Sequence, residues 1–400
     1  MPIPSPFHER MVHLSKSHQW KDWAGFLAPS SFEVNHIYEY TAFRQSAGLL
    51  DVTPLFKYSI SGPDAAAFLS RVTVRNMTKL KPGRVTYCCW CDEKGKLVDD
   101  GTVACVAEHE YRLSAAEPMY RWLLRLSRGF QVQIKDVTRE LACLALQGPT
   151  SRDILAACSD APMNKLKFFG LAHANLDGAQ VQISRTGYTG DLGYEIWMKN
   201  EDALAVWDAL IDAGRNYDIL PVGLDALDMV RIEAGFILLG VDYFSAPHCV
   251  VESQKSTPYE MGLDWTVQLK RDKFIGQDAL CREKENGSAW QLVGLEFNWD
   301  QLEALYDSYG LPPNIPPQAC RSALPIYCEG EQVGQVTSNT WSPVLKKLIG
   351  LGSVRRPFAD IGQVLDVEHT VEYERKTIEA TVVPRPFFDP ERKRFTPDAA

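Results

Sequence analysis

The sequence predicts an α+β protein with a separate β-rich module at its C-terminal end. Over the first 285 residues, strand-like runs alternate with amphipathic helical stretches, and hairpin signals outnumber helical crossovers. Beyond residue 288, short strands recur with few helix signals, which is typical of a sandwich or a small barrel. The polar, glycine-containing stretch 283–288 places a boundary between one domain over 1–285 and another over 289–390.

In the first domain, the patterns begin with a strand and a helix. Apolar and polar side chains alternate over 56–60, which predicts a half-buried strand with Lys57 on its polar face. Gly62-Pro63-Asp64 predicts a helix start, because proline fits a first helical turn and an acid fits its positive end. Further strands are expected at 85–91, 97–106, 141–146, 181–185 and 194–197, and further helices at 119–127, 150–157, after Asn200 and after 221–223.

The pattern of the second domain predicts strands and no helices. They are expected at 291–297, 323–328, 332–338, 347–354, 364–367 and 377–383. Between the first two lies a long stretch, 300–318, that ends in a proline-rich run, and we interpret it as an insertion or covering loop.

Composition and missing motifs exclude several classes of function. The chain has 42 basic and 51 acidic residues, a net charge of −9, which argues against a nucleic-acid partner. The sequence contains no run of 18 apolar residues, so we expect no membrane span. The N-terminus does not resemble a secretory signal, and we therefore expect a cytoplasmic protein. No dinucleotide fingerprint, P-loop, H-E-x-x-H or G-x-S-x-G motif occurs, which argues against nicotinamide, ATP-driven and common hydrolase chemistry.

Three of the ten cysteines cluster at Cys88, Cys89 and Cys91. Their spacing is not C-x-x-C, and no second cluster completes a tetrahedral zinc site. In a strand, Cys89 and Cys91 share one face and Cys88 takes the other. We therefore expect these thiols to pack in the core and expect no metal.

Five segments, taken together and in order, resemble one family. They are 48–52 (GLLDV), 94–100 (KGKLVDD), 185–195 (RTGYTGDLGYE), 223–235 (GLDALDMVRIEAG) and 334–343 (GQVTSNTWSP). The resemblance is to the aminomethyltransferase family, the T-protein of the glycine cleavage system with its relatives that demethylate small molecules. It implies a folate-binding core of α/β subdomains, one of them ferredoxin-like, around a central channel, followed by a C-terminal β-barrel.

The resemblance also implies tetrahydrofolate as co-substrate and a one-carbon transfer to its N5 atom. N5 must lose a proton or have developing positive charge stabilised, and a fixed carboxylate can do either. Asp99 and Asp100 are adjacent in a predicted strand, so only one can line the folate pocket. The family match gives that catalytic place to Asp99, on the face that carries Val103, and leaves Asp100 a structural role.

The family match names further folate-binding residues. Glu195 matches the pterin-binding glutamate, and a carboxylate can accept two hydrogen bonds from an aminopyrimidine edge; the alternative is a solvated strand acid. Tyr87 would flank a flat ring, or be an ordinary core tyrosine. Arg231 would lie in the site, or form an i,i+3 ion pair with Asp228. Tyr188, Trp265 and Val103 complete the expected set.

One segment departs from the family. Members usually continue Asp-Val-Ser-His-Met where this chain reads Asp51-Val52-Thr53-Pro54-Leu55, near the substrate entrance. We therefore expect a tetrahydrofolate-dependent methyltransferase or demethylase that acts on a small methylated donor. The alternative is the aminomethyltransferase of glycine cleavage, with a lipoylated carrier protein as partner. A third hypothesis, a non-catalytic folate-binding module, fits poorly with an intact Asp99.

Overall fold

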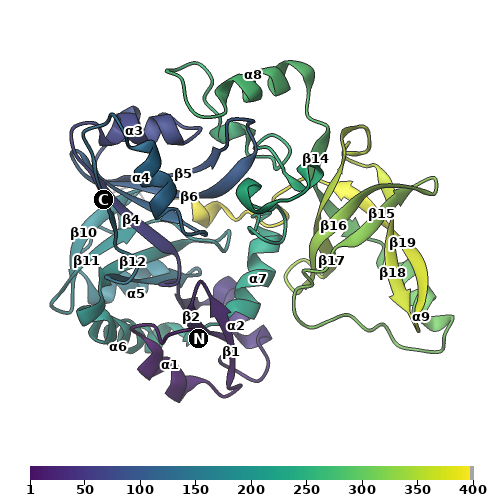
Figure 1. Cartoon of the computed structure of the whole chain (residues 1–400). Coiled ribbons are helices and arrows are strands. Elements are labelled where there is room, and N and C mark those ends of the chain that lie inside the picture. The colour runs from purple at the N-terminus through teal and green to yellow at the C-terminus, as the bar shows by residue number, and fades with distance from the viewer. Residues whose placement is uncertain (397–400) are drawn as a thin grey trace.

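The computed structural model describes residues 1–396. Its core holds two β-sheets that lie face to face, each covered by helices on its outer side (Figure 1). A six-stranded barrel stands beside this core. No helix in the described part of the chain is long and apolar enough to cross a membrane.

The first sheet has the spatial order β5-β6-β7-β4-β8. Its strands are β4 (Phe56–Ser61), β5 (Arg84–Cys91), β6 (Leu97–Ala107), β7 (Glu110–Ala115) and β8 (Gln133–Asp136), and helices α3 (Ala65–Val72) and α4 (Tyr120–Leu126) cover it. Chain order β4-α3-β6-β7-α4-β8 with spatial order β6-β7-β4-β8 is the ferredoxin-like arrangement that the resemblance implies. Helix α3 packs here because its apolar residues recur at helical spacing.

The second sheet has the order β10-β11-β12-β9-β3-β13, antiparallel except where β13 joins β3. Its strands are β3 (Ala47–Asp51), β9 (Leu141–Gln147), β10 (Leu171–Leu176), β11 (Ala179–Ser184), β12 (Gly193–Lys199) and β13 (Ile219–Pro221). Helices α5 (Ser151–Cys158) and α6 (Ala203–Gly214) cover its outer side. The N-terminal residues add α1 (His8–Leu14), β1 (Gln19–Trp23), β2 (Phe26–Ser31) and α2 (Ile37–Gln45).

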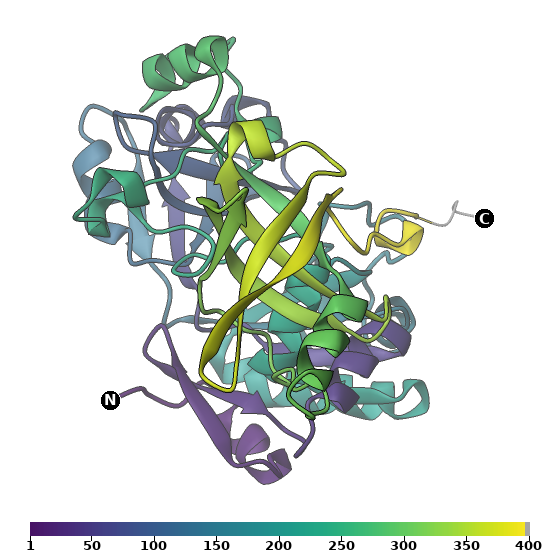
Figure 2. The ribbon, with the colours of Figure 1, turned by 90° about the vertical axis from the view of Figure 1, so that its right-hand side faces the viewer.

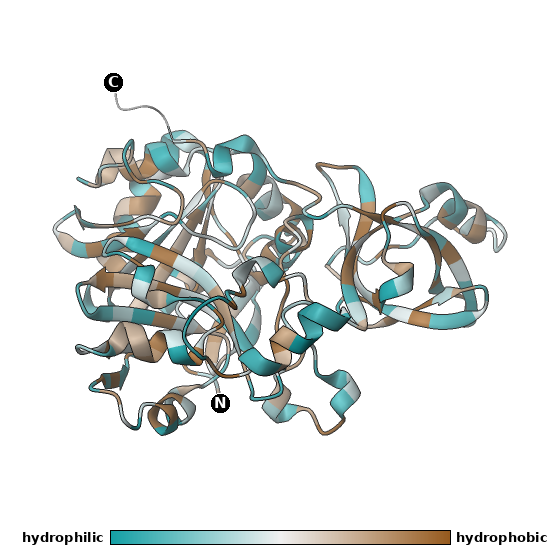
Figure 3. Cartoon of the chain, turned by 90° about the horizontal axis from the view of Figure 1, so that it is seen from above, coloured by the Kyte–Doolittle hydropathy of each residue, from teal (hydrophilic) through white to brown (hydrophobic). Residues whose placement is uncertain are grey.

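The barrel closes in the order β14-β17-β16-β15-β18-β19, and Figure 3 shows it as a ring. Helix α8 (Gln277–Asn286) precedes β14 (Trp290–Phe297), β15 (Leu324–Cys328), β16 (Glu331–Ser342), β17 (Lys347–Arg355), β18 (Val364–Val371) and β19 (Glu374–Val383). The expected strands are all present. The loop expected at 300–318 is partly wrong: it begins with helix α9 (Trp299–Asp307), whose Leu302 and Tyr306 pack on the barrel core.

Helix α7 (Leu224–Glu233) connects the two parts. It packs against α2 and β2 on the core side and against β16 and β17 of the barrel. After β19 the chain leaves the barrel and returns to the core (Figures 1 and 2), where the backbone N–H groups of Phe387 and Phe388 donate to the carbonyl of Glu233. The junction of core, barrel and C-terminal segment is therefore held by contacts distant in sequence.

Lys57 contradicts its expected place on a polar strand face. Its side chain is 0 % exposed because the second sheet covers this side of β4. The ammonium donates to the carbonyls of Thr53, at 2.5 Å, and Leu55, at 2.9 Å. Burial lowers the pKa of Lys57 to about 8, since water no longer solvates the charged form.

A pH dependence of stability follows from this buried amine. Between pH 8 and its ordinary pKa of 10.5, the unfolded chain binds a proton at Lys57 that the folded chain has lost. We expect the free energy of unfolding to rise across this window by up to about 3 kcal/mol relative to Lys57→Met, which lacks the titrating group. Urea unfolding of both proteins at several pH values measures the difference. Parallel stability curves would contradict the burial argument.

Candidate active site

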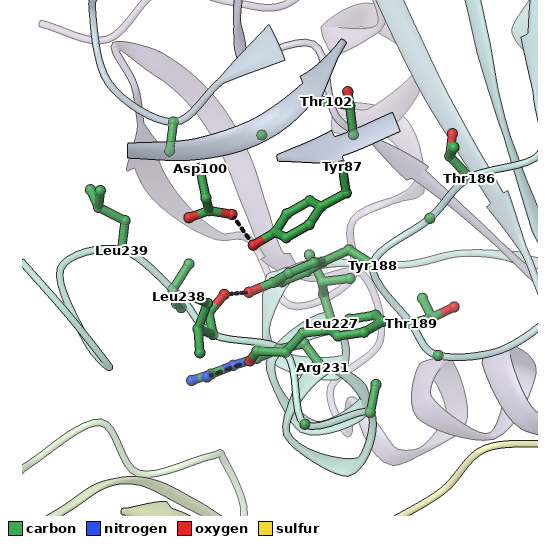
Figure 4. Close-up of a pocket in the computed structure, with 18 of the residues that line it drawn as sticks. Tyr87, Asp100, Thr102, Thr186, Tyr188, Thr189, Leu227, Arg231, Leu238 and Leu239 are labelled. Atoms are coloured by element: carbon green, nitrogen blue, oxygen red, sulfur yellow. Dashed lines mark hydrogen bonds between the residues drawn. The ribbon is translucent and has the colours of Figure 1, made fainter. Parts of the chain in front are cut away.

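A cavity of about 1270 Å³ lies between the two sheets, at the end where α7, the barrel and the C-terminal segment meet. The first sheet contributes residues of β5, β6 and β7, and the second contributes residues of β9 and β12. The glycine-rich turn 186–191 and the loop after α7 form further walls. Figure 4 shows the part of this cavity around Tyr87, Tyr188 and Arg231.

Asp100 is the carboxylate of the paired aspartates that lines this cavity. Its Oδ2 accepts a hydrogen bond of 2.7 Å from the hydroxyl of Tyr87 (Figure 4), and its Oδ1 accepts one from the hydroxyl of Tyr243. Burial raises the pKa of Asp100, while the two phenol donors act in the opposite direction because they stabilise the charged form.

The expected place of Asp99 in the pocket is wrong. Its carboxylate is 0 % exposed and accepts backbone N–H bonds from Asp100 at 2.7 Å, Ala116 at 3.1 Å and Glu117 at 2.9 Å. Asp99 therefore anchors the turn after β7. Val103 is also misplaced, since it packs in the apolar core beneath α3 and α4, and Thr102 takes the cavity side.

Strand register explains this exchange. Asp99 and Val103 do share a face, as parity predicts, but that face is the one the helices cover. Tyr87 pairs with Thr102 across the hairpin, and Trp90 pairs with Asp99. Residues directly opposite each other share a face, so the strand that presents Tyr87 to the cavity must present Asp100 with it.

Glu195 lines the cavity from β12 and is half-buried. Its Oε2 accepts a 2.8 Å hydrogen bond from the hydroxyl of Thr186. Burial raises the pKa of the Glu195 carboxyl, and the positive charge of Arg112 opposes that rise. The side chain is therefore not the fully solvated strand acid of the alternative interpretation.

Two aromatic pairs stand in the cavity wall. Tyr87 stacks on Trp265 with ring centroids 5.8 Å apart, and Tyr188 stacks on Phe236 at 5.6 Å. Trp265 is 55 % exposed, and the guanidinium of Arg75 lies over its ring, 5.6 Å from the centroid. The turn that carries Tyr188 needs Gly187, because a Cβ there would lie 1.9 Å from the side-chain oxygen of Gln147.

Arg231 lies in the cavity wall, but it is fully buried and already paired. Its Nε donates to Asp228 at 2.7 Å, which is the i,i+3 pair of the alternative interpretation, and its Nη1 donates to Asp242 at 2.5 Å. The barrel-side Arg321 binds the other oxygen of Asp228 at 2.6 Å. Arg231 thus joins α7 to the following loop while its outer nitrogen, Nη2, has no partner among the described residues.

Sequence reasoning missed Tyr243 and the apolar wall formed by Leu55 and Phe56. An aromatic in a loop carries no local signal of its partner. Leu55 departs from the family pattern, whereas the alternation over 56–60 assigns Phe56 to the apolar face with Tyr58 and Ile60 and gives no signal of the cavity.

The polar and aromatic side chains that line the cavity fit a reduced pterin. Two carboxylates, Asp100 and Glu195, can accept hydrogen bonds from an amine-rich edge, and the stacked aromatic pairs suit a flat ring. Trp197 adds a buried indole N–H that has no partner in the described structure. Across residues 1–396, no group of three or more His, Cys, Asp or Glu side chains is arranged to hold a metal ion.

Comparisons with known proteins agree with a core followed by a barrel. Residues 8–271 match the GCVT N-terminal domain, and residues 310–389 match the glycine cleavage T-protein C-terminal barrel domain. The aminomethyltransferase of Halothermothrix orenii is 35% identical over 88% of this chain and 91% of its own length. That of a Geobacillus strain is 35% identical over 92% and 94%.

A solved structure agrees over the whole fold. Glycine cleavage system aminomethyltransferase T from Bartonella henselae superposes with a TM-score of 0.82 at 25% identity, covering 97% of this chain and 99% of that one. The predicted fold class, the one-carbon transferase activity and tetrahydrofolate as co-substrate are thereby confirmed. With both domain matches and relatives aligned over nearly their full length, the chain belongs to the aminomethyltransferase family of glycine cleavage T-proteins.

Proposed function

We propose that this protein is the aminomethyltransferase of a glycine cleavage system. It would take an aminomethyl group from a lipoylated carrier protein, pass the carbon to tetrahydrofolate and release ammonia. The observation that carries the proposal is a cavity holding Asp100 and Glu195 in a chain whose relatives, aligned over about nine tenths of their length, are aminomethyltransferases. This inverts the order expected from the sequence, where a small methylated donor came first.

Different residues of the cavity would bind the pterin and accept its proton. Glu195 would accept hydrogen bonds from the aminopyrimidine edge and fix its orientation. Tyr87, Trp265 and Tyr188 would contact the flat ring. Asp100 would take the proton that N5 loses as it bonds to carbon, and the two tyrosine hydroxyls would keep the carboxylate in place. Tetrahydrofolate itself supplies the nucleophilic nitrogen.

One observation favours the second candidate, demethylation of a small donor. Leu55 and Phe56 both line the cavity, and Pro54 precedes them where the family has histidine. Apolar side chains at the entrance reduce the polar groups available to a lipoyl-borne amine and suit a compact methylated compound. The carrier-protein partner and the cytoplasmic location stay predictions.

A reconstituted assay separates the two candidates. The protein is mixed with tetrahydrofolate and either an aminomethyl-loaded lipoylated carrier protein or a panel of N-, S- and O-methylated small molecules. The proposal expects methylene-tetrahydrofolate and ammonia with the carrier protein. Methyl-tetrahydrofolate from a panel compound, with no turnover of the carrier protein, would establish the second candidate instead.

Replacing Glu195 tests its binding role. Glu195→Ala is expected to weaken tetrahydrofolate binding by about 2–3 kcal/mol, because buried donors of the ligand lose a charged acceptor. Calorimetry measures the affinity. Glu201→Ala, at an exposed acid two residues after the same strand, is the matched control and should bind normally. Equal affinities for both variants would return Glu195 to the role of an ordinary strand acid.

A further inference from the structure

The loop after α7 is fixed by the barrel. Asp242 in this loop is buried, and its Oδ1 accepts hydrogen bonds from the hydroxyls of Thr337, at 2.5 Å, and Ser338, at 2.9 Å, on β16. Its Oδ2 accepts the bond from Arg231 at 2.5 Å and one from the backbone N–H of Leu238 at 2.8 Å. Asp242 therefore ties the loop to both the barrel and α7.

An irregularity in β16 allows two neighbouring hydroxyls to donate to the same oxygen of Asp242. Adjacent strand residues normally point to opposite faces, yet Thr337 and Ser338 reach the same oxygen. The pairing of β16 with β17 shifts register between Val336 and Ser338, which leaves Thr337 as the extra residue of a bulge. Bulges commonly re-aim a side chain in this way. The T-S pair also belongs to the 334–343 motif, to which the proposed function assigned no role.

Tyr243 links Asp242 to Asp100 in the active site. It follows Asp242 directly, is 1 % exposed, and its hydroxyl donates to Oδ1 of Asp100. Its carbonyl accepts a 2.8 Å bond from the N–H of Gly240, which closes the loop beneath it. The chain of contacts runs from β16 through Asp242 and Tyr243 to Asp100, a path that crosses from one domain to the other.

We infer that Tyr243 is a positioning residue that holds Asp100 as an oriented carboxylate, and that the barrel fixes Tyr243 through the bond of Asp242 to Thr337 and Ser338. The barrel domain then completes the active site although none of these barrel side chains reaches Asp100. The inference rests on the proposed role of Asp100. Tyr87 supplies the other donor, so loss of Tyr243 would leave the carboxylate bonded on one side only.

Other charges around Asp100 must be weighed in any pH experiment. Asp99 precedes it on β6, Cys88 and Cys89 lie on β5, and Tyr188 stands in the glycine-rich turn. The nearby cations are Arg75, whose charge acts on Cys88, and Arg231, whose charge acts on Tyr188. None of these is altered by removing one hydroxyl at position 243.

The test compares Tyr243→Phe with Tyr259→Phe. Phenylalanine fills the same space at both positions, and the Tyr259 hydroxyl is buried without a partner in the described structure. Losing a donor to a charged carboxylate should raise the Asp100 pKa by about one pH unit. The acid limb of the kcat/KM profile should move up equally, giving roughly tenfold lower kcat/KM below the limb. Tyr259→Phe should leave the limb in place.

A second readout does not depend on turnover. Carbon NMR of protein labelled at aspartate carboxyls gives the Asp100 pKa directly, with the signal identified by its loss in Asp100→Asn. If no donor supports turnover, the proposed function fails while this measurement still tests the positioning. An unchanged Asp100 pKa in folded Tyr243→Phe would overturn the inference.

A separate variant tests the hydrogen bonds between the barrel and Asp242. Thr337→Val with Ser338→Ala removes both hydroxyls that hold Asp242 and leaves the cavity residues untouched. The expected result is an Asp100 pKa shift in the same direction as in Tyr243→Phe. A lower melting temperature with no shift in the pKa would show that these hydroxyls only stabilise the domain contact, and would overturn the barrel's part in the inference.

Discussion

Asp100→Asn is expected to cut turnover by roughly 100-fold or more, the scale for losing an acid–base or electrostatic group. Asparagine keeps the shape, and both tyrosine hydroxyls can still bond to its side-chain amide, so the fold and the cavity should persist. Tetrahydrofolate affinity should stay within about 1 kcal/mol. The measurements are kcat with the donor that the reconstituted assay identifies, and calorimetric affinity for tetrahydrofolate.

Asp99→Asn is the matched comparison, one residue away. Its two oxygens accept three backbone N–H groups, and an amide nitrogen cannot accept any of them. We expect a stability loss of about 2 kcal/mol and a much smaller loss of turnover than at position 100. A normal Asp100→Asn enzyme beside an inactive Asp99→Asn enzyme would contradict the assignment.

Arg231→Met is expected to destabilise the protein by about 3–5 kcal/mol, because it leaves buried Asp242 without its cation and leaves Asp228 paired with Arg321 alone. Asp228 and Asp242 are 7 % and 0 % exposed at their side chains, so water cannot replace the guanidinium. Chemical unfolding with urea measures the loss. Because Arg231 joins α7 to the loop that carries Tyr243, folded Arg231→Met should also show a raised acid limb.

The control for this variant is a pair with the same spacing on the surface. Arg215 and Asp212 form an i,i+3 ion pair with side chains that are 74 % and 72 % exposed. Arg215→Met should cost less than about 1 kcal/mol, as exposed pairs do. If Arg231→Met cost no more than Arg215→Met, the buried pairs would contribute little to the fold.

Local patterns predicted most of the fold. Helix α3 and the barrel strands were found because alternation and helical spacing report burial on one side. Lys57 shows the limit: alternation marks two faces, but it cannot say that a second sheet covers the polar one. Helix α9 was missed although Asn298 caps it and Leu302 and Tyr306 are four residues apart, a signal hidden by the proline-rich stretch that follows.

The active site was predictable only in part. Glu195, Tyr188 and Arg231 line the cavity from the segments 185–195 and 223–235, which carry the family resemblance. Tyr87 and Trp265 match family positions outside those segments, and they line the cavity as well. The choice between Asp99 and Asp100 depends on which face of β6 the helices cover. Alternation along the strand separates the two faces, but it does not tell which of them lies under the helices. Pairing Tyr87 with Thr102 across the hairpin would have decided it. Tyr243 depends on a contact across 143 residues, which no local pattern encodes.

A crystal structure with a stable reduced folate tests the central claim most directly. The account predicts the pterin in the cavity between the two sheets, with Glu195 bonded to its aminopyrimidine edge and Asp100, still bonded to Tyr87 and Tyr243, facing the reduced ring. A folate bound elsewhere, or one that contacts Asp99 while Asp100 points away, would contradict it.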